Sequence, residues 1–341
     1  MRALEEFITP TQKGLYNKLR KIYKGKATAC KNSYVLVRGE APIMLVAHLD
    51  TVHKEPVQEI CKTNNGNILM SPQGIGGDDR CGVYALCAVY DQAPVKPWLL
   101  FTCDEEIGGV GAEQFCTKHQ LGKLPKEIDS LKLLVEIDRK GKDDAVYYDC
   151  ANEEFEDYIT TKGFKTQWGS FSDISYIAPE LGVAAVNLSS GYYNAHTQHE
   201  YINRKHLNAT VQKVLSIVAD AAEPDFPKYE YVESTRYDRW WGGWGFHAKS
   251  SLKSTTLSTK KESALSTTTV DEDAFLKDVP DHIRDEYAAL LDFYSIEELE
   301  YHRKENGDNV IIMLFESEFG SWEDYYGMDP EDDSYSRYGI M

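Results

Sequence analysis

Five short clusters in the first 200 residues combine histidine and carboxylate side chains that could bind a metal ion or transfer a proton. In chain order they read AHLD, GGDDR, DEEIGG, EIDR and NAHTQHE. Two imidazoles with several carboxylates, and no thiolate, form a ligand set that suits zinc, manganese or cobalt. The clusters therefore predict a site for two divalent metal ions, with zinc as the first expectation and manganese or cobalt as the alternatives.

We expect each cluster to supply one metal ligand. The five ligands are His48, Asp78, Glu106, Asp138 and His196. Asp78 is expected to bridge the two ions, because a carboxylate has two oxygens and because the glycines beside it let the backbone approach closely. One ion would be held by His48, Asp78 and Asp138. The other would be held by Asp78, Glu106 and His196.

The two residues predicted to act on the reaction without binding metal are Glu105 and Asp50. Adjacent glutamates make sense only if their roles differ, so Glu106 is the ligand and Glu105 the general base. Glu105 would take a proton from the attacking water and pass it to the leaving nitrogen. Asp50, two residues after His48, would orient the imidazole. This chemistry is hydrolysis of a peptide or amide bond.

Each cluster also has a simpler interpretation when taken singly. A Glu–Glu pair is usually a solvated surface, and Asp–Asp after glycines is usually a turn followed by a helix cap. A histidine in a polar loop usually contacts only solvent. The joint occurrence of all five clusters, at the ends of predicted elements, favours the metal site.

Alternating strands and helices are predicted to bring the clusters together. Short apolar runs predict buried strands, and 3.6-residue periodicity predicts helices. The strands are expected at 34–37, 43–47, 98–102, 131–137 and 183–188, and the helices at 15–22, 82–90 and 207–218. Such alternation predicts a largely parallel sheet covered on both faces. Four clusters follow strands, and Asp78 begins a helix, so the clusters should meet at the carboxyl edge of the sheet.

Composition excludes several classes of function. The formal net charge of −18 argues against non-specific binding to DNA or RNA, because phosphates would be repelled. The seven cysteines are odd in number and form no Cys-x-x-Cys pair, which argues against a disulfide framework or a zinc knuckle. No signal peptide is recognisable, and no apolar stretch approaches the roughly 20 residues that span a bilayer. We therefore expect a cytoplasmic protein that binds neither nucleic acid nor membrane.

Composition also divides the chain into three regions. A catalytic domain is expected at 1–225, an aromatic segment with a flexible Ser/Thr/Lys linker at 226–270, and a small C-terminal module at 271–341. Within the last region, 271–304 has helical patterning and 310–315 is expected to form a strand.

The aromatic segment and the C-terminal module have no assigned role. Trp240, Trp241 and Trp244 would form either an exposed patch for a protein partner or, as we favour, a cluster that packs on the catalytic domain. The C-terminal module could likewise dock a protein partner.

The five motifs, in this order, resemble the signature of the clan MH di-zinc exopeptidases, which include aminopeptidases, carboxypeptidases and amino-acid deacylases. The resemblance covers roughly residues 10–222. It implies an α/β fold, a phosphorylase/hydrolase-like three-layer α/β/α sandwich with a mixed, mostly parallel sheet, and the ligand, bridging and base roles given above. It favours His196 over His199 as the last ligand, because Thr197 follows directly and Glu200 comes three residues later. Ser172 and Asp173 resemble a Ser–Asp element near the family's site.

Departures from the family pattern bear on the substrate. The segments between motifs are too short to hold the inserted lid or dimerisation domain of many members, so the chain resembles the compact form, closest in layout to simple aminopeptidases. AHLDTVH, however, resembles the deacylase and carboxypeptidase branch. A tyrosine often precedes the last histidine of simple aminopeptidases. This chain has Ala195 there, with Tyr192 and Tyr193 upstream.

Three hypotheses of function remain. The first is an exopeptidase of aminopeptidase type that acts on short peptides. The second is an N-acyl amino acid deacylase or amidase, which shares the metal chemistry and differs in its pocket. The third is a non-catalytic binding protein on the same fold. Its usual sign would be the loss of a ligand or of the base, and the sequence retains all of them.

Overall fold

The computed structural model describes residues 2–233 and 276–291, together with residues 296, 299, 300, 303, 308, 311, 312, 314 and 315. The chain forms two compact units, Met1–Ser234 and Thr235–Met341. The predicted tryptophan cluster and the predicted linker lie outside the described residues.

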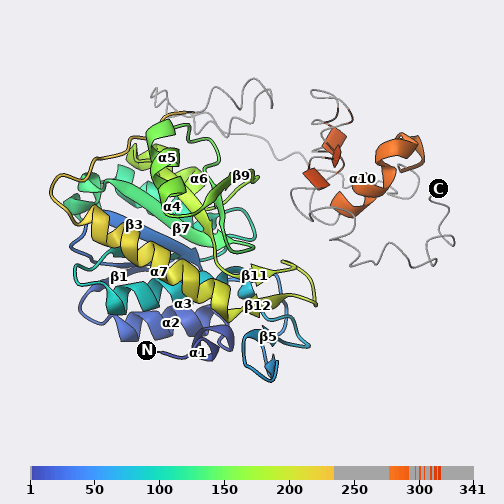
Figure 1. The fold of residues 1–341 in the computed structure, drawn as a ribbon, viewed down its shortest axis with the longest axis horizontal. Helices are drawn as coiled ribbons and strands as arrows, with labels where there is room; N and C mark the ends of the chain where they lie inside the picture. The colour runs from blue at the N-terminus through green and yellow to red at the C-terminus, as the bar shows by residue number, and fades with distance from the viewer. Residues whose placement is uncertain are drawn as a thin grey trace, which may run out of the picture. The chain divides into compact units, whose positions relative to one another are not determined.

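The first unit is built on an eight-stranded sheet (Figure 1). In spatial order its strands are β1 (Ala27–Cys30), β2 (Tyr34–Val37), β6 (Trp98–Thr102), β3 (Ile43–His48), β7 (Leu133–Arg139), β10 (Ala185–Ser189), β8 (Asp144–Val146) and β9 (Lys165–Gln167). The pairs β6–β3, β3–β7, β7–β10 and β8–β9 are parallel. The pairs β1–β2, β2–β6 and β10–β8 are antiparallel. The expected mixed, mostly parallel sheet is confirmed.

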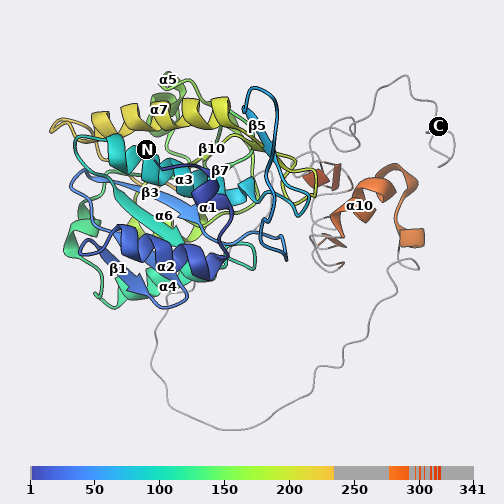
Figure 2. The same ribbon diagram turned by 90° about the horizontal axis from the view of Figure 1, so that it is seen from below.

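Helices cover both faces of this sheet (Figure 2). On one face lie α1 (Glu5–Ile8), α2 (Gln12–Ile22), α3 (Gly77–Gln92), α5 (Glu153–Thr161) and α7 (Arg204–Ala221). On the other lie α4 (Val110–Gln120) and α6 (Ile174–Leu181), and the 3-10 helix η1 (Lys126–Ser130) contributes Ile128 to the same core. The α/β/α sandwich expected from the sequence is therefore confirmed.

The central strands read as continuous apolar runs because both of their faces are buried. Val35 and Val37 of β2 point into the core beneath α2 and α3, whereas Tyr34 and Leu36 point into the core beneath α4 and α6. This alternation follows from the two-residue period of a strand. A parallel sheet with helices on both faces gives such runs in place of the apolar–polar alternation of a half-exposed strand.

A second, smaller sheet lies beside the carboxyl edge of the main sheet. Its antiparallel order is β11 (Tyr192–Tyr193), β12 (Tyr201–Asn203), β5 (Ile68–Met70) and β4 (Cys61–Lys62). These short strands were not predicted from the sequence. They matter because the β11–β12 hairpin carries the last of the five clusters, and β5 leads into the glycine-rich loop before α3.

The second unit is described only in part. It contains η2 (Leu276–Asp278), η3 (Asp281–Ile283) and α10 (Arg284–Leu290), and the Arg284 guanidinium donates to the carbonyl oxygens of Leu276 and Val279. Helical patterning is expected for 271–304, and within the described part of that range these three short helices are found. The strand expected at 310–315 is wrong, because the described residues 311, 312, 314 and 315 are helical. A short apolar run does not distinguish a strand from a buried helix.

The first unit extends past the expected domain boundary at residue 225. Tyr229 is buried in its core, and isolated bridges pair Glu230 with Val183 and Glu233 with Cys150. Residues 226–233, assigned by composition to the aromatic segment, therefore pack on the catalytic unit. Among the residues that the structure describes, no helix is both long and apolar enough to cross a membrane.

Phe115→Ala is expected to lower the free energy of unfolding by about 3–5 kcal/mol, because it empties a buried site. Phe115 of α4 is fully buried and meets the Tyr34 ring edge-on, with ring centroids 5.6 Å apart. The matched control is Leu121→Ala, just beyond the same helix, where the side chain is 58% exposed. Its effect should stay within about 0.5 kcal/mol. Urea unfolding measures both, and equal losses would contradict the assigned core.

Candidate functional site

The four predicted strand-end clusters lie at the carboxyl ends of four neighbouring parallel strands. In the sheet order β6–β3–β7–β10, β3 ends at His48, β6 leads into the turn with Glu105 and Glu106, and β7 carries Asp138. The hairpin after β10 carries His196. Because parallel strands end at one edge, residues far apart in sequence meet there.

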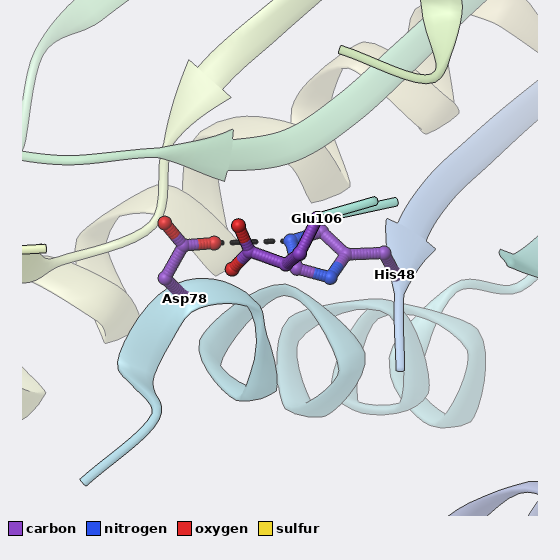
Figure 3. Close-up of side chains that lie close together, drawn as sticks. All are labelled: His48, Asp78 and Glu106. Carbon is purple, nitrogen blue, oxygen red and sulfur yellow. Dashed lines mark hydrogen bonds and ion pairs between the residues drawn. The ribbon is translucent and has the colours of Figure 1, made fainter. Parts of the chain in front are cut away.

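His48 is the centre of the first half of the site. Its Nε2 lies 3.0 Å from Asp78 Oδ1 and 3.5 Å from Asp138 Oδ1. Its Nδ1 lies 3.3 Å from Asp50 Oδ1, the orienting contact expected for Asp50. The ring is buried. Figure 3 shows His48 at the end of its strand, with its ring pointing toward Asp78 at the start of α3.

His196 is the centre of the second half. Its Nε2 lies 3.3 Å from Asp78 Oδ2 and 3.2 Å from Glu106 Oε2. His196 has a φ of +63°, which is uncommon for a residue with a side chain and is typical of sites where geometry is imposed. The two oxygens of Asp78 thus face two different histidines, as a carboxylate that bridges two cations would have to do.

The donor set fits divalent cations. Among the described residues, Glu106 Oε1 and Asp138 Oδ1 are buried oxygens without a hydrogen-bond partner. Buried carboxylate oxygens nearly always have a partner, and a divalent cation held between these side chains would supply one for both. His48, Asp78 and Glu106 also offer donor atoms that lie within 4.8 Å of one another. The residues present therefore fit a divalent cation, and His48, Asp78 and Glu106 belong to the set predicted from the sequence.

Burial and mutual repulsion shift the pKa values of the clustered side chains. Burial raises the pKa of Asp138 well above its ordinary value, and the Asp78 carboxylate adds to the shift. Burial also raises the pKa of Glu105, against the opposing charge of His48. Burial alone would lower the pKa of His48, but the neighbouring carboxylates, Asp138 foremost with Asp50 and Asp78, together raise that pKa well above its ordinary value. Carboxylates crowded in one buried space repel one another, and either a bound proton or a nearby cation relieves that repulsion.

Asp50 connects the two halves of the site. Besides contacting His48, it accepts hydrogen bonds from the backbone N–H groups of Glu105 and Glu106, each at 3.1 Å. The same carboxylate therefore orients an imidazole and fixes the turn that carries the predicted base and a predicted ligand. The sequence foresaw only the first role.

Gln12 holds the same turn from the N-terminal side and was missed by sequence reasoning. Its amide nitrogen donates to Asp104 Oδ1 at 2.7 Å, and its amide oxygen accepts from the Asp104 N–H at 3.0 Å. Asp104 has a φ of +60°, so its backbone conformation needs such support. A lone glutamine at the start of a helix, distant in sequence from the turn it contacts, offered no signal for this role.

Glu200 was quoted only as part of the last motif, yet it holds the loop that presents Asp78. It is fully buried and accepts the N–H groups of Gly76 and Asp78, each at 2.9 Å, and contacts His53 Nε2 at 2.8 Å. The signal that could have found it was the acid three residues after Thr197, together with the second histidine of AHLDTVH.

Glycine is required in the loop before Asp78. Gly74 has a φ of +82°, and a Cβ there would lie 2.2 Å from the His53 ring. A Cβ on Gly77 would lie 2.6 Å from Tyr192 Cβ. Asp78 and Asp79 have non-helical backbone angles, so the regular part of α3 begins after them. The glycines thus allow the close approach that the sequence predicted.

Behind the site lies a buried polar layer. The Ser172 hydroxyl donates to Glu136 and lies 3.5 Å from Asp138 Oδ2, and Thr102 donates to Asp173. Burial raises the pKa of Asp173 to about 6. The Ser172–Asp173 element therefore lies close to the site, as its resemblance implied, with Ser172 next to a predicted ligand.

The structure separates the remaining candidates. His199 is exposed, and its backbone N–H donates to Thr197, so of the two histidines only His196 reaches the carboxylates. The Tyr192 hydroxyl lies 3.3 Å from the carbonyl oxygen of Asp138, whereas the Tyr193 hydroxyl contacts His206. Tyr192 is therefore near the site.

Glu200→Ala is expected to lower the free energy of unfolding of the metal-free chain by about 2–4 kcal/mol, because two buried N–H groups and His53 lose their acceptor. Glu200→Gln should lose less, since its amide oxygen still accepts. Urea unfolding in the presence of a chelator measures both, with the exposed Glu59→Ala as the control. If Glu200→Ala unfolded like the control, the buried network would not hold the loop.

Similarity to known proteins is found among solved structures. No protein-family model matches the sequence, and no curated protein matches it significantly. A tripeptidase from Staphylococcus aureus is 14% identical, with a TM-score of 0.49. The alignment spans 64% of this chain and 96% of the tripeptidase, which is nearly the whole length of that protein.

Two further similar structures are named as aminopeptidases. Aminopeptidase PepT from Bacillus cereus is 14% identical, with a TM-score of 0.48 and coverage of 64% of this chain and 98% of the other. An aminopeptidase from the archaeon Desulfurococcus kamchatkensis is 13% identical, with a TM-score of 0.47 and coverage of 63% and 93%.

Proposed function

We propose that this chain is a metal-dependent hydrolase of peptide or amide bonds that uses two divalent ions, with zinc as the first expectation. The activity that we favour is that of an exopeptidase of aminopeptidase type on short peptides. The observation that supports it most directly is the pair of contacts from Asp78, whose Oδ1 faces His48 and whose Oδ2 faces His196.

The ligand roles follow from these contacts. His48, Asp78 and Asp138 would hold one ion, and Asp78, Glu106 and His196 the other. Two such ions, when bound, would polarise the scissile carbonyl and lower the pKa of a bound water. The contribution of the chain is to fix the ligands in place, which it does through Asp50, Glu200 and the glycine loop.

Glu105 is assigned as the general base on its position. Its carboxylate lies beside the ligand cluster, with Oε2 3.9 Å from His48 Nε2, and its backbone N–H is fixed by Asp50. It lies three residues after the end of β6 and neighbours a predicted ligand without being needed in either ligand set. From this position Glu105 would take a proton from the attacking water and deliver it to the leaving nitrogen.

A substrate panel on the full chain tests this function. Metal-free protein is reconstituted separately with zinc, manganese or cobalt and assayed on aminoacyl anilides, dipeptides and N-acetyl amino acids. Glu105→Gln, prepared in parallel, corrects for contaminating peptidases. Hydrolysis of the aminoacyl substrates supports the proposal, and hydrolysis of the N-acetyl amino acids alone would make the chain a deacylase. If none of the three metals supported hydrolysis of any of these substrates, the proposed hydrolase activity would be refuted.

A further inference from the structure

A cavity of about 540 Å³ lies beside the candidate metal site and shares Asp50 and Glu106 with it. Four segments supply most of its walls: residues 8–12 before and in α2, the loop 51–57 after β3, Gly74–Gly76, and the turn 104–107 after β6. Arg80 of α3 also lines it. This volume is in the range of small-ligand sites, which run from about 300 to 1,000 Å³. The cavity lining includes Glu106, one of the five predicted ligands, so the cavity borders the candidate metal site at that residue.

Two exposed apolar side chains line this cavity. Ile107, which directly follows Glu106, is 74% exposed, and Val52, which follows Asp50 by two residues, is 40% exposed. Single exposed apolar residues are common on protein surfaces and need no explanation. These two, however, line the same cavity as Glu106, a predicted ligand. Buried Ile8 and Ile75 also contribute to its lining.

The charged residues of the cavity are mostly engaged with the protein. Arg80 is buried and donates to the carbonyl oxygens of Phe7 and Pro10 at 3.0 and 2.8 Å. Burial lowers its pKa to about 10, which still leaves it cationic at neutral pH. His53 contacts Glu200. Lys54 and Glu55 are exposed at the rim, with opposite charges. The side chains of Ile107 and Val52 therefore make the part of the cavity next to Glu106 apolar.

The wall that carries Ile107 is held in place before any ligand arrives. Gln12 fixes Asp104 through two hydrogen bonds, and Asp50 fixes the N–H groups of Glu105 and Glu106. A wall held on both sides loses little conformational entropy when a side chain packs against it, and such preorganisation favours binding.

We propose that this cavity takes the apolar side chain of the amino-acid unit whose amide bond is cleaved, and that Ile107 and Val52 determine this specificity. The inference rests on the proposed function and deepens it by naming the substrate class: peptides or acyl amino acids with a branched or long apolar side chain at the cleaved unit. Either proposed reaction releases a free amino acid. Free amino acids are therefore probes of the cavity that require no turnover.

The first experiment measures binding by calorimetry. L-leucine, L-alanine, L-lysine and L-aspartate are titrated into the zinc-loaded full chain. Leucine should bind at least about 10-fold more tightly than alanine, since each methylene in an apolar pocket contributes about 10-fold or more. Its binding should also show a negative heat-capacity change, the mark of apolar burial. If aspartate bound more tightly than leucine, the charge of Lys54 would determine the preference of the cavity, and the inference would be overturned. Equal binding of all four amino acids would also overturn it.

Matched variants link the preference to the proposed residues. Ile107→Asp should remove most of the preference for leucine and raise the relative affinity for lysine, and Val52→Ala should weaken leucine binding less. Leu121→Asp places the same charge at another exposed apolar position outside the cavity and should leave every affinity unchanged. Because Ile107 is largely exposed, its substitution should not prevent folding, and urea unfolding checks this.

Turnover separates failure of the inference from failure of the proposed function. The kcat/KM values for leucyl and alanyl substrates are compared between wild type and Ile107→Asp. Hydrolysis whose leucine preference is absent, or unchanged in the variant, would overturn the inference and leave the hydrolase standing. Absence of all hydrolysis in the wild type would refute the proposed function. A leucine preference in both binding and turnover, lost only in the Ile107 variant, supports the inference.

Discussion

Glu105→Gln is expected to keep both metal ions and to lose turnover by about 10²–10⁴-fold, the usual contribution of a general base. Glutamine has nearly the same shape but accepts no proton at neutral pH. The fold around it should persist, because the turn is held by Asp50 through backbone N–H groups that the substitution does not alter. The KM should change less than kcat.

Elemental analysis and steady-state kinetics on the same preparation test this expectation. The control is Glu113→Gln, an exposed residue in the first turn of α4, which should behave as wild type in both. Near-normal turnover in Glu105→Gln would remove the base assignment. Loss of metal together with turnover would instead make Glu105 a ligand.

Asp78→Ala is expected to lose both metal ions, the largest effect of any single ligand substitution. Every other predicted ligand serves one ion, whereas the two oxygens of Asp78 face the two histidines and would serve both. Removing the bridge also removes the charge that offsets the repulsion between two divalent cations. Hydrolysis should fall to the level of the metal-free chain.

The metal content of Asp78→Ala is measured by elemental analysis after dialysis against zinc, with Glu59→Ala as the control for an exposed carboxylate. Zinc should also raise the unfolding temperature of the control and leave that of Asp78→Ala nearly unchanged, because only a ligand that binds the native state stabilises it. Retention of one tightly bound ion would show that Asp78 serves a single ion.

The central part of the fold could be predicted from the sequence because its strands and helices show clear patterns within short stretches of the chain. Apolar runs such as those of β3 and β6 are continuous because both faces are buried, and the polar clusters follow where the strands end. The carboxyl-edge rule then placed His48, Asp138 and the turn after β6 together, without any knowledge of the sheet order.

The parts that sequence reasoning missed depend on contacts between distant segments. The short strands of the second sheet have little pattern of their own, because two or three residues are too few to show a period. Gln12 contacts Asp104 across 92 positions, and Glu200 contacts the loop before Asp78 across more than 120. No local signal marks such residues, although they hold the segments that carry the predicted base and the predicted bridging carboxylate. The strand predicted at 310–315 was wrong for a different reason. That segment does have a local pattern, but a short apolar run fits a buried helix as well as a strand.

The most direct test of the proposed metal centre is the number of zinc ions that the full chain binds. Metal-free protein is titrated with zinc by calorimetry, and the bound metal is then counted by elemental analysis. We expect two ions per chain in the wild type, both lost in Asp78→Ala, because one carboxylate faces both histidines. A wild-type chain that binds no zinc, manganese or cobalt, or whose bound zinc is unaffected by the loss of Asp78, would contradict the metal centre and the hydrolase built on it.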